Sequence, residues 1–186
     1  MASKLERAYR FHGHESPGTT LGVIMADYAL ELFRENITCD DKKDMKAFVE
    51  TRKCIADSVQ IATGRTAGGG LTVVDYGKYA VTLYNATSGE GVRVFVDPEK
   101  TREYKNIDDW FLRRKPKKDL PKEIVIKEIL KAGRNILSHE SVKIKVLGKK
   151  HLPIKICVKC KEAFPSECDE LCEGCRNPYY EKKWNA

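Results

Sequence analysis

Two closely spaced cysteine pairs near the C-terminus constrain the fold of this chain more than any other sequence feature. Cys157-x-x-Cys160 and Cys172-x-x-Cys175 are separated by eleven residues, which is long enough for the chain to cross and return. Each pair can form a tight turn, so that four thiolates converge on one tetrahedral Zn²⁺ ion. Because so short a segment contains little apolar material, metal binding must supply much of its folding free energy. The spacing therefore predicts one structural zinc site formed by these four cysteines.

The residues around the second pair predict the type of finger. Asn177-Pro178 can begin a final helix over residues 178–184. A cysteine knuckle followed by such a helix is typical of a treble-clef-like zinc finger. Cys168 lies between the pairs and is interpreted as a spare thiol, with replacement of a neighbouring ligand as the alternative. A redox-active dithiol is the alternative to the structural zinc site as a whole.

The other cysteine and hydropathy patterns indicate a cytoplasmic protein. The chain of 186 residues has seven cysteines, an odd number that is crowded toward one end. No stretch approaches the roughly 18 apolar residues of a membrane span, and residues 1–13 lack the apolar run of a signal peptide. We therefore expect metal ligands and free thiols rather than a disulfide framework.

The formal net charge of +7 is unevenly distributed along the chain. Residues 1–96 carry no net charge, residues 97–155 carry +8, and residues 156–186 carry −1. A basic middle region can bind the phosphate backbone of nucleic acid. A solvated connector is the alternative, and we expect nucleic-acid binding to be weak and independent of sequence at most.

Residues 10–22, RFHGHESPGTTLG, place two of the four histidines just before a predicted helix. Ser16 can cap the helix through its hydroxyl, and the fixed φ of Pro17 suits the first helical position. The helix is expected to run to about Phe33. Apolar residues at steps of three and four form its core-facing stripe: Leu21, Ile24, Met25, Tyr28 and Leu32.

His12 and His14 therefore lie just upstream of a helix N-terminus. The partial positive charge of that end favours an anion or a neutral imidazole, and neutral imidazole is the form that binds metal. The alternative is a turn at Gly13 in which both rings pack locally. These residues alone leave both interpretations open.

The rest of the pattern indicates an α+β fold. A short helix is expected at residues 54–64, with strands at 45–54, 71–77, 79–86 and 92–97. Ala47 and Val49 should share one face of the first strand, opposite Phe48. Helical segments at 98–115 and 121–139, broken at Pro116 and Pro121, should form the middle region, followed by a strand at 142–147 and a linker at 148–153.

The predicted architecture is two N-terminal helices with an antiparallel β-meander, a helical middle region and a small C-terminal finger. The domain boundary is expected at residue 150, between an α+β domain of residues 1–150 and a zinc-binding domain of residues 151–186. Two sets of side chains are expected to pack in the middle region: Ile124, Ile126, Ile129, Leu130 and Ile136 on the second helical segment, and Trp110 with Phe111 on the first.

Taken in order, these motifs resemble the FmdE family, whose name comes from a component of formylmethanofuran dehydrogenase. Residues 11–22, FHGHESPGTTLG, match a family pattern FHGH-x-C-PG-x-x-LG. Residues 54–68, CIADSVQIATGRTAG, and residues 75–85, DYGKYAVTLYN, match two further family segments, and many members end in a cysteine finger. The chain departs from the pattern at Ser16 and Arg65, where the family usually has cysteine. A thiol redox pair in the N-terminal domain is therefore not expected.

The resemblance implies a second site, a pocket at the N-termini of two helices. Cys54 begins one of these helices, where the helix dipole favours the thiolate form. The expected catalytic residues are Cys54, His14 and Asp57, and the expected ligand-binding residues are His12, Gln60 and Arg65. His12, His14 and Cys54 would be the ligands if this pocket holds a second metal. Lys78 and Tyr84 either point into the pocket or are ordinary strand residues.

The resemblance implies a function linked to C1 metabolism, as a formylmethanofuran dehydrogenase-related or metal-dependent enzyme or as an accessory component of one. The ligand would be a small anionic or carbonyl compound, and a homodimer and a partner enzyme are implied. The alternative is a non-catalytic binding or regulatory protein whose basic middle and finger contact nucleic acid or a partner protein. The finger also resembles those of DksA/TraR-type regulators, which keeps this alternative open.

Overall fold

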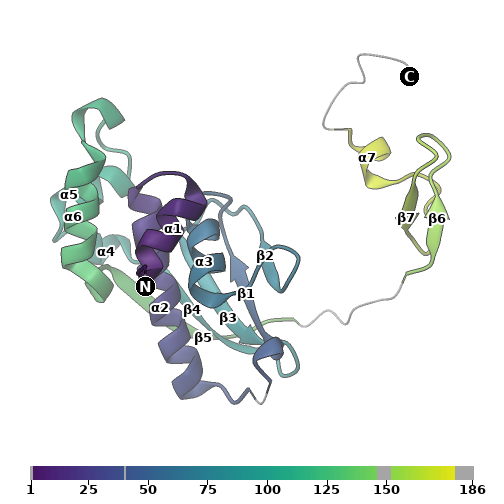
Figure 1. Cartoon of the computed structure of the whole chain (residues 1–186), viewed down its shortest axis with the longest axis horizontal. Coiled ribbons are helices and arrows are strands. Elements are labelled where there is room, and N and C mark those ends of the chain that lie inside the picture. Colours follow the sequence, from purple (N-terminus) through teal and green to yellow (C-terminus); the bar gives the residue numbers. More distant parts are fainter. Residues whose placement is uncertain (1, 40, 146–151, 179–186) are drawn as a thin grey trace. The chain divides into compact units, whose positions relative to one another are not determined.

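The computed structural model describes residues 2–39, 41–145 and 152–178. The chain separates into two compact units, Met1–Val146 and Leu147–Ala186, shown in Figure 1. Each unit is described by itself. The boundary expected at residue 150, most of the linker predicted at 148–153 and most of the helix predicted at 178–184 lie outside the described residues.

Helix α1, Lys4–His12, is an element that the sequence analysis did not predict. The Ser3 hydroxyl accepts from the Glu6 N–H at 3.1 Å, and a Glu6 carboxylate oxygen accepts from the Ser3 N–H at 2.7 Å. This capping box was present in the sequence as Ser-x-x-Glu. Only Ala8 of the helix is buried, so α1 lacks the broad apolar stripe that identifies a core helix. It ends at Gly13, whose φ of +91° is the left-handed conformation that glycine adopts easily.

Helix α2, Pro17–Asn36, begins as the sequence predicts and ends three residues later than expected. The Ser16 hydroxyl accepts from the Thr19 N–H at 3.1 Å, and Pro17 occupies the first turn. The helix packs against two central strands of the sheet and against α3 and α6. Its fully buried residues Leu21 and Met25 therefore lie at the centre of the core.

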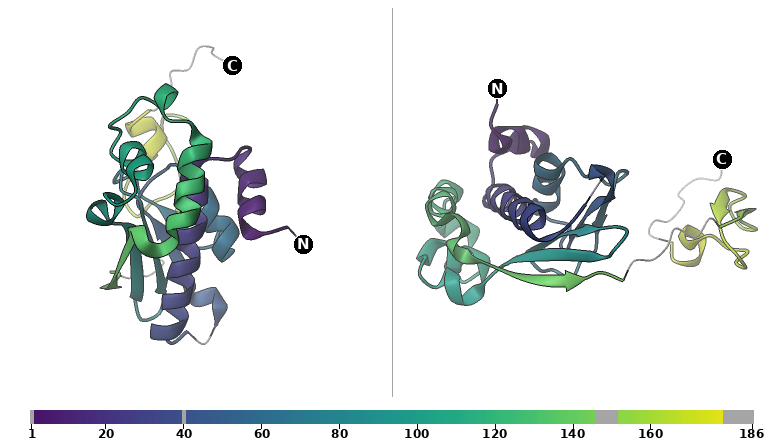
Figure 2. Two further views of the ribbon diagram at one scale, coloured as in Figure 1. Left: turned by 90° about the vertical axis from the view of Figure 1, so that its left-hand side faces the viewer. Right: turned by 90° about the horizontal axis from the view of Figure 1, so that it is seen from below.

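The main sheet has five strands in the order β2-β1-β3-β4-β5. Their bounds are Met45–Val49 (β1), Leu71–Val73 (β2), Ala80–Asn85 (β3), Glu90–Val96 (β4) and Leu137–Lys143 (β5). In β1, Ala47 and Val49 are buried and Phe48 is half-buried, as the alternation predicts. Figure 2 shows α1, α2 and α3 on one face of this sheet.

The sheet is mixed, whereas the sequence analysis placed 71–77 in an antiparallel meander. Strand β2 pairs in parallel with β1, and β3 takes the antiparallel position on the other side of β1. Helix α3, Ile55–Thr63, connects β1 to β2, and parallel neighbours require such a crossover connection. Strands β1, β3, β4 and β5 are antiparallel to their neighbours in that series.

The middle region differs from the two helical segments that were expected. Residues 98–115 form two short helices, α4 (Pro98–Thr101) and α5 (Lys105–Phe111), and α6 spans Lys122–Ala132. Ile124 and Leu130 of α6 are 48% and 51% exposed, so their assignment to the core was wrong. Val125 is buried instead, because α6 is rotated from the predicted face. Short 3₁₀ turns cover Lys42–Asp44, Lys117–Asp119 and Gly133–Ile136, and β5 begins five residues before the predicted strand.

The C-terminal unit contains the antiparallel pair β6 (Ile154–Ile156) and β7 (Ala163–Pro165), followed by α7 (Glu173–Arg176). Fold class and finger thus agree with the sequence analysis: an α+β unit and a small cysteine-containing unit. None of the helices in the described ranges combines the length and apolar character that a membrane span requires.

Candidate functional site

The four cysteines of the two pairs come together in the C-terminal unit. Their sulfur atoms all lie within 4.8 Å of one another. Cys157 follows β6 and is fully buried, and Cys175 lies in α7. Within residues 2–39, 41–145 and 152–178, this is the group of His, Cys, Asp or Glu side chains that can hold a metal ion. Cys168 is exposed and lies outside the group.

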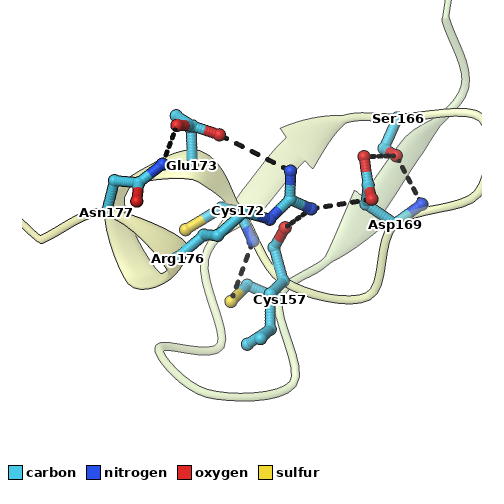
Figure 3. Close-up of polar contacts among 8 residues, drawn as sticks. Cys157, Ser166, Asp169, Cys172, Glu173, Arg176 and Asn177 are labelled. Carbon is cyan, nitrogen blue, oxygen red and sulfur yellow. Dashed lines mark hydrogen bonds and ion pairs between the residues drawn. The ribbon is translucent and has the colours of Figure 1, made fainter.

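Backbone hydrogen bonds prepare the first cysteine of this group for the thiolate form. The Cys172 N–H donates to the Cys157 sulfur at 3.4 Å (Figure 3). Hydrogen bonds from the backbone of Cys160 and Cys172 lower the pKa of Cys157 to about 6. Burial and the neighbouring sulfurs of Cys172 and Cys160 raise the pKa of Cys175 to about 12. Four thiolates at this separation repel one another, so a bound cation is needed to hold all of them ionised.

Arg176 fixes the loop that carries the second pair, as Figure 3 shows. Its guanidinium contacts the Asp169 carboxylate at 2.7 Å and the Leu171 carbonyl oxygen at 3.4 Å. The Ser166 hydroxyl accepts from the Asp169 N–H at 2.8 Å. Sequence reasoning missed Arg176, because an arginine adjacent to a CxxC pair has no distinctive pattern.

In the N-terminal unit, the opening histidine motif contacts the segment that begins at Cys54. His12 Nδ1 lies 2.7 Å from the carboxylate of Asp57, 45 residues away in the chain. His12 is the last residue of α1, and Asp57 lies in the first turn of α3. The ring centroids of His12 and His14 are 4.5 Å apart. The structure therefore brings three of the predicted site residues together.

One nitrogen of the His12 ring has no protein partner. The side chain is 14% exposed, and Nε2 is buried without a hydrogen bond. When a carboxylate accepts the Nδ1 proton of a neutral imidazole, Nε2 carries the free lone pair. Such an atom can take a proton or bind an electrophile, and a buried polar atom without a partner is unfavourable unless something occupies it.

Cys54 lies at the N-terminus of α3 and against the first turn of α2. A Cβ atom added to Gly18 would lie 3.1 Å from Cys54 Cβ and 3.5 Å from its sulfur. One turn further along, the Ser58 hydroxyl donates to the Thr19 carbonyl at 2.8 Å, and a Cβ at Gly22 would lie 2.7 Å from Ser58 Cβ. The missing side chains of these two glycines allow the close helix contact that places the Cys54 thiol beside two helix N-termini.

Gln60 and Arg65 lie toward the opposite end of α3. The nine residues of this helix span about 13 Å, which separates the backbone of Arg65 from that of Cys54. Gln60 Oε1 accepts from the Ala67 N–H at 3.4 Å, and Arg65 Nε is buried without a hydrogen-bond partner. A ligand contact by either residue stays a prediction.

The N-terminal residues do not present a metal-ligand set in the described part of the chain. His12, His14 and Cys54 do not bring their ligand atoms together as the four cysteines do. A second metal at this site therefore stays a prediction, and it would require the side chains to rearrange.

Many cations of the basic middle region are neutralised by neighbouring carboxylates. Lys105 and Lys115 contact Asp109 at 3.4 and 2.8 Å, and Arg114 contacts Asp108 at 3.2 Å. Arg134 forms an ion pair with Glu31 of α2. These ion pairs favour a structural role for the region over a phosphate-binding surface.

Comparison with known proteins identifies the family. The model of the family "FmdE, Molybdenum formylmethanofuran dehydrogenase operon" matches residues 11–145. The chain belongs to the FmdE family. The matched residues include the histidine motif, the Cys54 segment and the whole main sheet.

Two similar proteins are informative. The crystal structure of an FmdE-like protein of tungsten formylmethanofuran dehydrogenase, from Syntrophus aciditrophicus, has a TM-score of 0.79 at 39% identity, covering 95% of this chain and 92% of that chain. A probable S-adenosyl-L-methionine-binding protein from Archaeoglobus fulgidus is 41% identical over 103 residues. That match covers 54% of this chain but only 28% of the relative's length.

Proposed function

We propose that this FmdE-family protein binds zinc in its C-terminal finger and acts on a small anionic or carbonyl compound at the N-termini of α2 and α3. The family and its solved member carry the name of formylmethanofuran dehydrogenase. The proposed setting is therefore C1 metabolism, as an enzyme or as an accessory component of a partner enzyme.

The hydrogen bond between His12 and Asp57 carries this proposal. The 2.7 Å contact joins two segments that are far apart in sequence, and it leaves His12 Nε2 buried and available. Asp57 orients the ring, Nε2 takes or returns a proton, and the Cys54 thiolate is the nucleophile. His14 is assigned as a second proton carrier because its ring lies 4.5 Å from that of His12.

Zinc is the proposed metal because the distance between two of the sulfurs suits it. A tetrahedral ion with Zn–S bonds of about 2.3 Å places its sulfur ligands about 3.8 Å apart. Cys160 Sγ and Cys172 Sγ are 3.7 Å apart. When bound, the ion supplies structural stabilisation, because four thiolates leave no open position for a substrate.

Selective alkylation of Cys54 tests the N-terminal site without a known substrate. Iodoacetate is a small carboxylate and iodoacetamide its neutral counterpart, so the ratio of their rates reports the preference for an anion. We expect this ratio to be higher at Cys54 than at the exposed Cys168, with modified sites identified by peptide mass spectrometry. His12→Ala should lower the Cys54 rate several-fold, whereas the matched variant His139→Ala should not.

Two results would overturn the proposed site. The first is that Cys54 in the folded protein reacts with neither reagent. The second is that its ratio of rates equals that of Cys168, which would show that the surroundings do not select an anion. Metal analysis separately tests the finger: one zinc per chain is the expected content, and two would place a further ion at His12, His14 and Cys54.

We also propose a homodimer located in the cytoplasm. The homodimer is implied by the resemblance to the family, and all seven cysteines are free thiols, as a reducing compartment maintains. Light scattering should give about twice the chain mass of 21.1 kDa. A monomeric mass would refute the dimer.

A further inference from the structure

A cavity of about 440 Å³ lies beside the sheet in the N-terminal unit, away from the His12–Asp57 contact. Its volume is within the range of small-molecule sites. Residues before α3, before and in the central strands, and at the end of α5 line it: Lys53, Gly77, Lys78, Tyr79, Arg93, Phe95, Val96, Pro98, Phe111, Leu112 and Arg113.

The lining is cationic, with four basic side chains and no acidic one. Arg93 is neutralised, because its guanidinium contacts the buried carboxylate of Glu50 at 2.5 and 3.0 Å and that of Glu140 at 2.8 Å. Lys53, Lys78 and Arg113 form no ion pair with any described residue. Three unpaired cations around one cavity produce a positive potential that attracts an anion.

The backbone at the end of α5 holds Arg113 in an unusual conformation. Its φ is +54°, in the left-handed region that residues other than glycine rarely adopt. Such conformations are found often where a side chain must be presented for binding. Leu112, the residue before it, also lines the cavity.

The other half of the lining is aromatic and packed. Tyr79 makes edge contacts with Trp110 and Phe111 at centroid distances of 5.8 and 5.5 Å, and Lys53 Nζ lies 5.5 Å from the centre of the Tyr79 ring. Burial raises the pKa of Tyr79, the Cys54 thiolate raises it further, and Arg113 acts against them. Tyr79 therefore lies within the electrostatic range of both Cys54 and Arg113.

We propose that this cavity binds a small organic anion, with a phosphate or carboxylate group between Lys53, Lys78 and Arg113 and an apolar or aromatic body against Tyr79, Phe95 and Phe111. This site goes beyond the proposed function, because neither His12 nor Asp57 lines it. The sequence alone left Lys78 open as either a pocket residue or an ordinary strand residue, and the structure assigns it to the cavity wall.

Titration of the full-length protein with phenyl phosphate tests the proposal. Calorimetry gives the affinity, and NMR locates the ligand by shifts at Tyr79 and Phe95. Lys78→Gln and Arg113→Gln should each weaken binding by about two- to fivefold, and the double variant by more. Lys127→Gln removes an exposed lysine that does not line the cavity and should leave the affinity unchanged.

Two further probes separate the charge from the ring. Inorganic phosphate and benzyl alcohol should both bind more weakly than phenyl phosphate, because each offers half of the recognised chemistry. Equal weakening by Lys127→Gln, equal affinity for inorganic phosphate, or no shift at Tyr79 and Phe95 would overturn the proposal. These readouts differ from alkylation of Cys54, so the two proposals can fail separately.

Discussion

The two units of this chain are stabilised by different interactions. In the unit that ends at residue 146, the helices and sheet bury a continuous apolar core that includes Leu21, Leu83 and Ile129. The C-terminal unit buries little apolar surface, and Ile154, Ile156 and Val158 are between 51% and 68% exposed. A unit of that size without a core depends on its metal. One chain thus contains one unit whose folding needs a ligand and one whose folding does not.

The largest expected effect is loss of the finger on replacing one of its ligands. Cys172→Ser should release one metal equivalent and unfold the C-terminal unit, because structural zinc contributes about 10–16 kcal/mol in small zinc fingers. Cys168→Ser should do neither. Metal analysis and NMR of the full chain check both, and equal metal loss in the two variants would refute the ligand assignment.

Truncation in the core should have the opposite selectivity. Leu83 is fully buried in β3, so Leu83→Ala should lower the free energy of unfolding of the N-terminal unit by about 2–5 kcal/mol. Leu130→Ala makes the same chemical change at a residue that is 51% exposed, and its cost should stay below about 1 kcal/mol. Denaturant titration followed by circular dichroism measures both. Metal content should be unaffected, and loss of metal from Leu83→Ala would break the distinction between the units.

The buried ion pair of the sheet should contribute an intermediate amount. Glu50 is 6% exposed and contacts Arg93 of β4 through both carboxylate oxygens. Glu50→Gln should cost about 1–3 kcal/mol, because it leaves a half-buried guanidinium with a weaker partner. Glu140→Gln, at the more exposed end of the same network, should cost less. A larger loss from Glu140→Gln, measured by the same titration, would contradict this ranking.

The smallest expected effect concerns the start of α2. Ser16→Ala removes the cap of a buried helix and should cost about 1 kcal/mol. Ser3→Ala removes the exposed cap of α1, from which only Ala8 is buried, and should cost less than Ser16→Ala. Thermal unfolding of the two variants provides the measurement, and an equal loss would show that burial does not distinguish the two caps.

The same contrast explains what the sequence could predict. The cysteine cluster was predictable because its four ligands lie within nineteen residues of one another and their spacing specifies the geometry. The start of α2 was predictable because Ser16 and Pro17 act locally. The parallel pairing of β2 was not, because it depends on where the helix after β1 returns the chain.

In the candidate N-terminal site, local patterns indicated the residues but not their contacts. The sequence placed His12 before one helix and Asp57 in another, while the 2.7 Å contact between them depends on the packing of α1 beside α3. Arg65 follows Cys54 closely in sequence but lies beyond the other end of the helix. The cavity beside Tyr79 combines residues from four separate segments, which no single motif could reveal.

Hydrogen exchange of the full chain, with and without a zinc chelator, tests the central contrast between the units most directly. The Val158 and Cys172 amides are held by contacts within the finger, to the Glu170 carbonyl and the Cys157 sulfur. We expect chelation to remove their protection while amides of β3 and β4 keep theirs. Finger amides that stay protected without metal, or core strands that lose protection together with the finger, would contradict the account.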